Sequence, residues 1–195
     1  MKKIALYGGT FSPPHIGHAS VIEAILRLFP CDEIWVMPSA DRHDKTASAQ
    51  SEHRLKMLRT MIGELFPNPN IPMLVSDFEI RTNKPTVTYE TLQALKKEYP
   101  DHEFYFVLGS ENLENIKTKW INGEKLLQEN NFLAIRNPFE KTSDNLPVNI
   151  TILEDVVWLE TSSTFIRDLI KNDYSGLPYL TKGVSEYIKQ NNLYK

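Results

Sequence analysis

Short apolar runs of strand length alternate along the chain with longer segments in which apolar residues recur every three or four positions. The strand-like runs cover residues 4–7, 33–37, 73–80, 104–108, 132–135 and 148–153. The helix-like segments cover residues 21–29, 55–65, 88–99, 162–170 and 184–188. This alternation is typical of an α/β protein with a parallel sheet. We therefore expect a Rossmann-like, doubly wound parallel sheet with helices on both faces.

Polar residues at the borders of these segments indicate where helices and loops begin. Thr88 is placed to cap the helix that follows it, and Ser162 or Ser163 can cap a later one. Residues 39–51 are polar and carry no apolar period, so we expect an exposed loop there.

The composition fits one folded unit. The chain has 195 residues, of which 41% are hydrophobic and 24% charged, which is enough apolar material for a substantial core. No internal repeat or linker interrupts it. We expect a single domain over residues 1–195, with a helical portion over about residues 162–195 packed on the rest.

The charge balance argues against broad binding of polyanions. Twenty-two Lys plus Arg face 25 Asp plus Glu, a net charge of −3, so we expect no nucleic-acid partner. No apolar run approaches the roughly 20 residues that span a bilayer, so we expect no membrane partner. The single cysteine, Cys31, agrees with a reducing compartment and a cytoplasmic protein. A homo-oligomer stays open, since self-association is common among soluble proteins.

The segment Gly8–His18, with the sequence GGTFSPPHIGH, lies between the first expected strand and the first expected helix. In an open parallel sheet this junction is at the carboxyl edge, where ligands bind. Glycines let the backbone approach a phosphate, and the helix start presents free N–H groups. His15 and His18 add imidazole donors. This set suits attack at a nucleotide phosphorus, where fixed donors stabilise charge on the phosphoryl oxygens.

Simpler interpretations of Gly8–His18 compete with phosphate binding. Gly-Gly and Pro-Pro are also ordinary turn residues, and a pair of surface histidines carries little information by itself. Two histidines could belong to a zinc site, but no third ligand stands nearby at the usual spacing.

The segment Thr161–Arg167, with the sequence TSSTFIR, begins the next-to-last expected helix. Its hydroxyls and free N–H groups suit phosphate oxygens, and Arg167 adds a permanent forked cation. From spacing alone, a plain Ser/Thr cap beside a solvated arginine is the simpler interpretation.

Both segments resemble motifs of one family. Gly8–His18 resembles the GGTFxPPHxGH signature of bacterial nicotinate (nicotinamide) mononucleotide adenylyltransferases, members of the HxGH nucleotidyltransferase superfamily. Thr161–Arg167 is similar to their ISSTxIR motif, which holds ATP phosphates. Class I aminoacyl-tRNA synthetases share the HxGH motif, but this chain is short and has no KMSKS-like loop. The RTxGISTT-type motif of related cytidylyltransferases is also absent.

The resemblance implies a role for further residues across nearly the whole chain. It implies catalytic roles for His15, His18 and Arg167. It implies contacts with ATP or its phosphates for Gly8, Gly9, Thr10, Phe11, Lys45, Gly109, Glu111, Ser162, Ser163 and Thr164. It implies contacts with the mononucleotide for Thr88, Trp120 and Arg136. No residue is expected to hold a metal by itself, and Mg²⁺ would enter with ATP.

Several positions depart from the family pattern. Ser12 stands where the family frequently has aspartate, and Asp44 lies in the segment that corresponds to the family's PPHK loop. Val87 replaces the tyrosine of the family's SYT segment, and Glu111 replaces an aspartate. These departures cluster around the expected pyridine pocket and the loop over ATP. Adenylyl transfer is therefore a firmer prediction than the identity of the acceptor.

The resemblance implies an enzyme that joins ATP and nicotinate mononucleotide into deamido-NAD and pyrophosphate. One alternative keeps the chemistry but changes the acceptor to nicotinamide mononucleotide, or to phosphopantetheine as in another HxGH adenylyltransferase. A second is a nucleotide-binding sensor without catalysis, although both histidines and Arg167 are retained.

Overall fold

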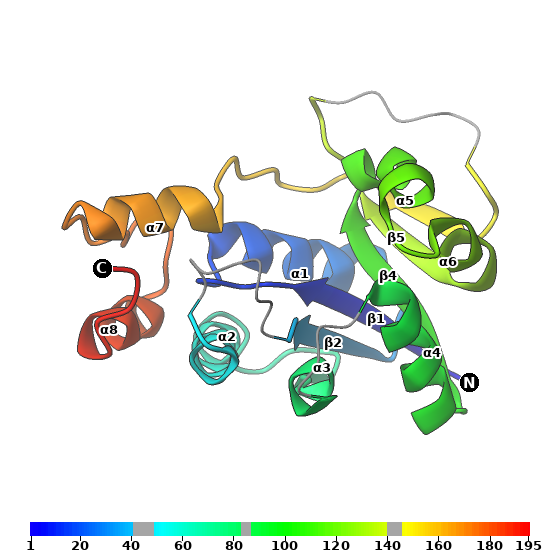
Figure 1. The fold of residues 1–195 in the computed structure, drawn as a ribbon, viewed down its shortest axis with the longest axis horizontal. Helices are drawn as coiled ribbons and strands as arrows, with labels where there is room; N and C mark the ends of the chain where they lie inside the picture. The colour runs from blue at the N-terminus through cyan, green and yellow to red at the C-terminus, as the bar shows by residue number, and fades with distance from the viewer. Residues whose placement is uncertain (41–48, 83–86, 140–145) are drawn as a thin grey trace.

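The strands of the computed structural model form one parallel sheet. The structure describes residues 1–40, 49–82, 87–139 and 146–195. Within these ranges six strands pair in the order β3-β2-β1-β4-β5-β6 (Figure 1). They are β1 (Lys2–Gly9), β2 (Glu33–Pro38), β3 (Met73–Val75), β4 (His102–Gly109), β5 (Asn131–Ile135) and β6 (Ile150–Leu153). All five pairings are parallel, and the order reverses between β1 and β4, so the expected doubly wound Rossmann-like sheet is confirmed.

Helices cover both faces of this sheet. They are α1 (Ile16–Leu28), α2 (Ser51–Leu65), α3 (Phe78–Thr82), α4 (Thr88–Glu98), α5 (Leu113–Lys119), α6 (Gly123–Glu129), α7 (Ser163–Lys171) and α8 (Lys182–Gln190), with a 3₁₀ turn, η1, at Ser110–Asn112. Buried residues of α1, α2, α7 and α8 form one hydrophobic core, and those of α3, α4, α5 and α6 form the other. In Figure 1 the C-terminal helix α8 lies beside α2.

The central strand β1 separates the two cores. Ile4 and Leu6 point into the core of α3 to α6, whereas Ala5 points into the core of α1, α2, α7 and α8. All three residues have no exposed surface. A strand buried on both faces has a continuous apolar sequence, which is why this run could be predicted from the sequence.

Three details of the secondary structure differ from the expectations. The expected strand over 73–80 ends at Val75, because Phe78 turns inward to the core as the first residue of α3 and its N–H donates to Ser76 Oγ. Thr88 does not cap α4; the cap position is Val87, without a side-chain bond. The apolar pattern of the sequence does not predict the helices α5 and α6.

The Ser162 cap, by contrast, is confirmed at the start of α7. No helix of the described residues is long and apolar enough to cross a membrane.

Candidate active site

The turn from β1 to α1 lies at the point where the strand order reverses. We call the segment Gly8–His18 the histidine turn. A Cβ on Gly8 would lie 3.1 Å from the ring of Phe106, and one on Gly9 would lie 3.1 Å from the ring of Phe11. Both contacts are tighter than a side chain tolerates without movement of the ring, so the glycines allow the close packing of this turn.

Phe11 holds the histidine turn in a folded-back shape. Its φ is 50°, in the left-handed region that a bulky residue rarely adopts. Its side chain is 1% exposed, and its ring lies edge-on to Tyr7 and to His18, with centroids 5.4 and 4.8 Å away. A conformation of this cost persists only where the surroundings over-determine it, so these contacts preorganise the turn.

His15 and His18 are fixed by reciprocal backbone contacts at the start of α1. The N–H of Gly17 donates to His15 Nδ1 at 3.2 Å, and the N–H of His15 donates to His18 Nδ1 at 3.1 Å. An Nδ1 atom that accepts a hydrogen bond carries no proton, so each neutral ring carries its proton on Nε2. Because the ring centroids are 3.8 Å apart, both donors belong to one small region.

The electrostatic surroundings keep both imidazoles neutral at pH 7. Burial lowers the pKa of His15 from 6.5 to about 4. Burial also lowers the pKa of His18 well below its usual value, and a charge on His15 would lower that pKa further. The pair can therefore offer two neutral Nε2–H donors to an anionic oxygen, whose bonds to N–H groups are strengthened by its charge.

The start of α7 supplies the hydroxyl groups expected from the sequence. Ser162 is the N-cap residue, and its side chain accepts the N–H of Phe165 at 3.2 Å. Because its hydroxyl is used in this way, Ser162 acts in the cap as the sequence predicted.

The start of α7 packs directly against the histidine turn. Ser163 Oγ donates to the carbonyl of Pro13 at 2.9 Å, and Arg167 Nη1 donates to the carbonyl of Ser12 at 2.8 Å. Arg167 Nη2 also donates to Thr164 Oγ1 at 3.1 Å. Two segments about 150 residues apart thus bring a guanidinium and two histidines to one place.

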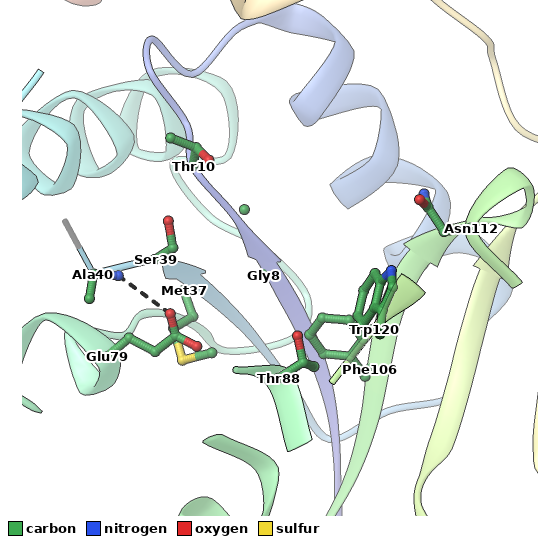
Figure 2. Close-up of a pocket in the computed structure, with 11 residues that line it drawn as sticks. Gly8, Thr10, Met37, Ser39, Ala40, Glu79, Thr88, Phe106, Asn112 and Trp120 are labelled. Carbon is green, nitrogen blue, oxygen red and sulfur yellow. Dashed lines mark hydrogen bonds between the residues drawn. The ribbon is translucent and has the colours of Figure 1, made fainter. Parts of the chain in front are cut away.

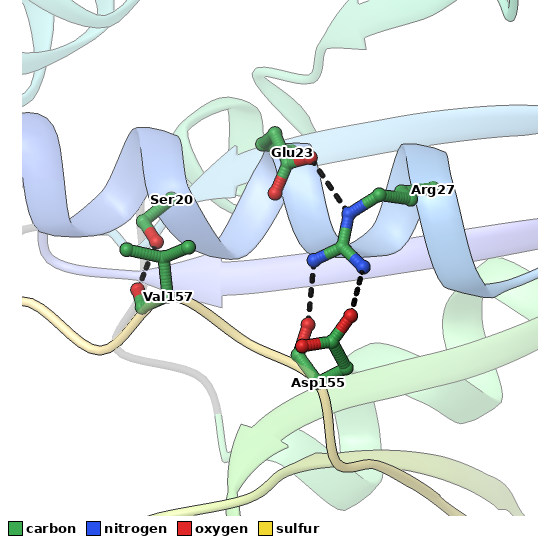
Figure 3. A network of polar contacts seen from close by, with 5 residues as sticks. All are labelled: Ser20, Glu23, Arg27, Asp155 and Val157. Carbon is green, nitrogen blue, oxygen red and sulfur yellow. Dashed lines mark hydrogen bonds and ion pairs between the residues drawn. The ribbon is translucent and has the colours of Figure 1, made fainter.

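The segment 154–161, which leads from β6 to α7, is held by α1. Figure 3 shows Arg27 of α1 donating to the carboxylate and to the carbonyl of Asp155, at 2.6 and 2.5 Å. One α1 residue, Ser20, also donates to the carbonyl of Val157. The helix that begins at the histidine turn therefore also fixes the path of the chain into α7.

A cavity of about 510 Å³ opens beside the histidine turn (Figure 2). It is lined by Gly8, Gly9, Thr10, Met37, Ser39, Ala40, Glu79, Thr88, Phe106, Asn112 and Trp120. Trp120 lies edge-on to Phe106 with centroids 6.3 Å apart, and Thr88 is next to this aromatic pair in Figure 2. The size of the cavity and its lining of both polar and aromatic residues suit a small polar ligand with an aromatic ring.

Glu79 is a cavity residue that the sequence analysis missed. It is 9% exposed, and its carboxylate accepts the hydroxyl of Thr91 at 2.7 Å and the N–H of Ala40 at 3.4 Å. Since Glu79 lies within the expected strand 73–80, nothing in the local pattern marked it as a buried polar group.

Arg54 of α2 is a second missed residue. It is 1% exposed, and it donates to the carbonyls of Thr10, Ser39 and Ala49 at 2.8, 2.7 and 3.0 Å. These carbonyls belong to the histidine turn, to the residue that follows β2 and to the chain before α2. Arg54 therefore ties together the backbone on one side of the cavity.

Gly109 and Glu111 follow β4 at the same edge of the sheet. The Glu111 carboxylate lies against Gly109, where a Cβ would clash with it. Its Oε1 accepts Asn112 Nδ2 at 2.8 Å, whereas Oε2 is buried and has no hydrogen-bond partner among the described residues. A buried acceptor of this kind can bind a ligand hydroxyl. Together, burial and Glu111 raise the pKa of Tyr7, which stays protonated.

The structure does not place two of the expected site residues, Arg136 and Lys45, at the cavity or the histidine turn. Arg136 follows β5, where its N–H donates to the carbonyl of Leu153, and it does not line the cavity. Lys45 lies outside the described residues, as does Asp44.

The described residues contain no group of three or more His, Cys, Asp and Glu that could hold a metal ion. Both histidine Nδ1 atoms already accept backbone N–H groups. The geometry of the pair is therefore that of two donors toward an anion rather than two ligands of a cation.

Comparison with known proteins defines the class. The sequence model of the cytidylyltransferase-like family matches residues 6–169, which include both the histidine turn and the start of α7. Together with the doubly wound sheet, this match makes the protein a nucleotidyltransferase of that class.

Individual relatives define the family more closely. A probable nicotinate-nucleotide adenylyltransferase of Bacillus licheniformis is 35% identical over 100% of both chains. The nicotinate-nucleotide adenylyltransferase of Bacillus subtilis is 31% identical, also over 100% of both. A structure of Plasmodium falciparum nicotinic acid mononucleotide adenylyltransferase complexed with NaAD superimposes with a TM-score of 0.83, at 27% identity, covering 100% of this chain and 98% of the other. This chain belongs to the nicotinate-nucleotide adenylyltransferase family.

Proposed function

We propose that this protein transfers the adenylyl group of ATP to nicotinate mononucleotide, forming deamido-NAD and pyrophosphate. The observation that carries the proposal is the contact of Arg167 with the Ser12 carbonyl, because it joins the α7 start to the turn that carries His15 and His18. The names of the full-length relatives support nicotinate mononucleotide as the acceptor.

The reaction needs positioned donors and no protein nucleophile. A phosphate oxygen of the mononucleotide attacks the α-phosphorus of ATP, the bond from that phosphorus to the bridging oxygen breaks, and pyrophosphate leaves with the electron pair. The attacking group is already an anion, so no proton has to be removed from it. Catalysis then consists of alignment and of stabilising the charge on the phosphoryl oxygens.

The histidine turn and the α7 start divide this work. His15 and His18 donate through Nε2–H to phosphate oxygens, and the backbone of Gly8–Phe11 forms the surface on which the phosphates lie. Arg167 supplies the permanent charge, with Ser163 and Thr164 beside it. Neutral imidazoles suit this role because their pKa values are held low by burial.

The neighbouring cavity would hold the mononucleotide and the ribose groups. Trp120 and Thr88 would contact the pyridine ring, since both line the cavity. Glu111 would accept a ribose hydroxyl with Oε2, which is buried without a partner among the described residues. Arg136 and Lys45 remain part of the proposal on the family resemblance alone.

A metal requirement follows from the use of ATP, and we propose Mg²⁺. In proteins, Mg²⁺ usually keeps several of its waters and is held by substrate phosphates together with few protein ligands. It therefore does not need a cluster of metal-binding side chains, and the described residues form none. It would supply charge neutralisation of the phosphate oxygens. The use of ATP also fits the cytoplasmic location that the sequence favours.

A pyrophosphate assay tests the proposal. Purified protein with ATP and Mg²⁺ receives nicotinate mononucleotide, nicotinamide mononucleotide or phosphopantetheine, and pyrophosphate release is followed. Fast release with nicotinate mononucleotide is expected. Preference for one of the other acceptors would change the assigned substrate, and binding of ATP without release in any mixture would indicate a sensor. An ATP analogue with a methylene group between the α- and β-phosphorus should give no release.

A further inference from the structure

The C-terminal end of the chain reaches the histidine turn. After α8 the chain turns back, and Tyr194 packs against the core formed by α1, α2, α7 and α8. Its hydroxyl lies 3.0 Å from Ser12 Oγ, a contact between residues 182 positions apart in the sequence. Tyr194 does not line the cavity, and the mechanism above does not use it.

Ser12 is the point at which several parts of the site meet. Its side chain is 1% exposed, and Oγ both contacts Tyr194 and accepts the N–H of Ala49 at 3.1 Å. Its carbonyl accepts Arg167 Nη1 at 2.8 Å. A displacement of Ser12 would therefore move the anchor of the guanidinium directly.

The neighbours of Ser12 make its position consequential for the histidines as well. Phe11 precedes it in a left-handed conformation, and the Phe11 ring packs on His18. A residue in such a conformation depends on the contacts around it. Ser12 is fixed on one side by Tyr194, so this contact helps to hold Phe11 in place.

The Tyr194 hydroxyl can serve this purpose across the whole physiological pH range. Burial raises the pKa of Tyr194 to about 12, although the hydrogen bond with Ser12 and the charges of Arg167 and Arg54 oppose the rise. The group therefore remains a protonated, neutral hydrogen-bonding partner of Ser12.

We propose that Tyr194 is a positioning residue for adenylyl transfer: through its contact with Ser12 it holds Arg167 and the histidine turn in the geometry that receives the ATP phosphates. This inference rests on the proposed function. It assigns a role in the site to the end of the chain, which lies beyond the residues that the family model matches.

The variant Tyr194→Phe removes only the hydroxyl. We expect it to lower kcat about fivefold, the scale of one lost hydrogen bond, and to raise the dissociation constant of ATP about threefold. The matched control is Tyr187→Phe, which removes a hydroxyl of α8 that contacts His53 Nδ1 at 2.9 Å, away from Ser12. The control should keep kcat and ATP affinity. A purely structural role would lower the melting temperature of both variants and leave kcat alone.

A double-mutant cycle with Ser12→Ala tests whether Tyr194 acts through Ser12. If it does, Ser12→Ala combined with Tyr194→Phe is no worse than Ser12→Ala alone. Independent, multiplying effects on kcat would overturn the proposal, as would an unchanged kcat and ATP affinity in Tyr194→Phe. If the unaltered protein releases no pyrophosphate with any acceptor, the proposed function fails, and ATP affinity alone then decides the role of Tyr194.

Discussion

The backbone N–H of His15 donates to Nδ1 of His18 at 3.1 Å, which fixes the orientation and the tautomer of the second imidazole at once. The helix start is thereby capped by the same two side chains to which the proposed function assigns the phosphate oxygens. Under that proposal each histidine has a structural and a chemical role, so a substitution must separate the two to be informative.

The variant His18→Ala should lower kcat at least about a hundredfold, the scale for losing one transition-state donor. It also removes the acceptor of the His15 N–H at the start of α1, so two further variants are needed. His18→Asn keeps an acceptor near the position of Nδ1, so this variant should stay folded but be as slow as His18→Ala. In His18→Gln the side-chain amide reaches toward the position of Nε2, so this variant should recover part of the rate. Near-normal turnover in His18→Ala, measured by pyrophosphate release, would remove His18 from the mechanism.

The stability of the protein should fall as the pH drops from about 6.5 to about 4. His15 has a pKa of about 4 in the folded state against 6.5 when unfolded, so the unfolded chain binds more protons in this window. The stabilisation is complete above pH 6.5 and is lost toward pH 4, at most about 3 kcal/mol.

Urea unfolding at a series of pH values measures this effect, with His15→Asn as the comparison. Asparagine is a good N-cap residue and does not titrate. The unfolding free energy of His15→Asn should decline less steeply between pH 6.5 and 4. Parallel curves for the two proteins would mean that His15 is not held neutral.

Elements with strong local signals could be predicted from the sequence. The run Ile4–Leu6 is continuously apolar, and it forms part of β1. Ser162 is a favoured N-cap residue placed directly before an apolar helical period, and it caps α7. The meeting of the histidine turn with the α7 start followed from the family resemblance, whereas spacing alone favoured a plain Ser/Thr cap beside a solvated arginine.

The remaining site residues depend on contacts that no local pattern records. Arg54 and Glu79 are charged residues, which are almost always exposed unless they are paired, and their partners come from other segments of the chain. Thr88 is a residue type that often caps helices, but here it lines the cavity instead. Tyr194 follows α8, which packs beside α2, and it contacts Ser12 across 182 positions of the sequence.

Replacing Trp120 should affect the mononucleotide more than ATP. In Trp120→Ala the cavity loses an aromatic face, and we expect the KM for nicotinate mononucleotide to rise about tenfold, as for a lost stacking contact. The KM for ATP serves as the internal control and should change little. Trp120→Phe keeps an aromatic face and should recover most of the affinity. An equal rise in both KM values would place Trp120 outside the mononucleotide site.

Arg54→Met should destabilise the whole fold as well as slow the reaction. Methionine fills similar space but leaves the carbonyls of the half-buried residues Thr10 and Ser39 without their donor, so the unfolding free energy should fall by about 3 kcal/mol. Arg59→Met changes an exposed arginine on the same helix and should shift stability by less than about 0.5 kcal/mol. Urea unfolding of both variants measures the difference. Equal stability of the two would show that the hydrogen bonds of Arg54 are replaced by water, and the backbone around the cavity would then not depend on this residue.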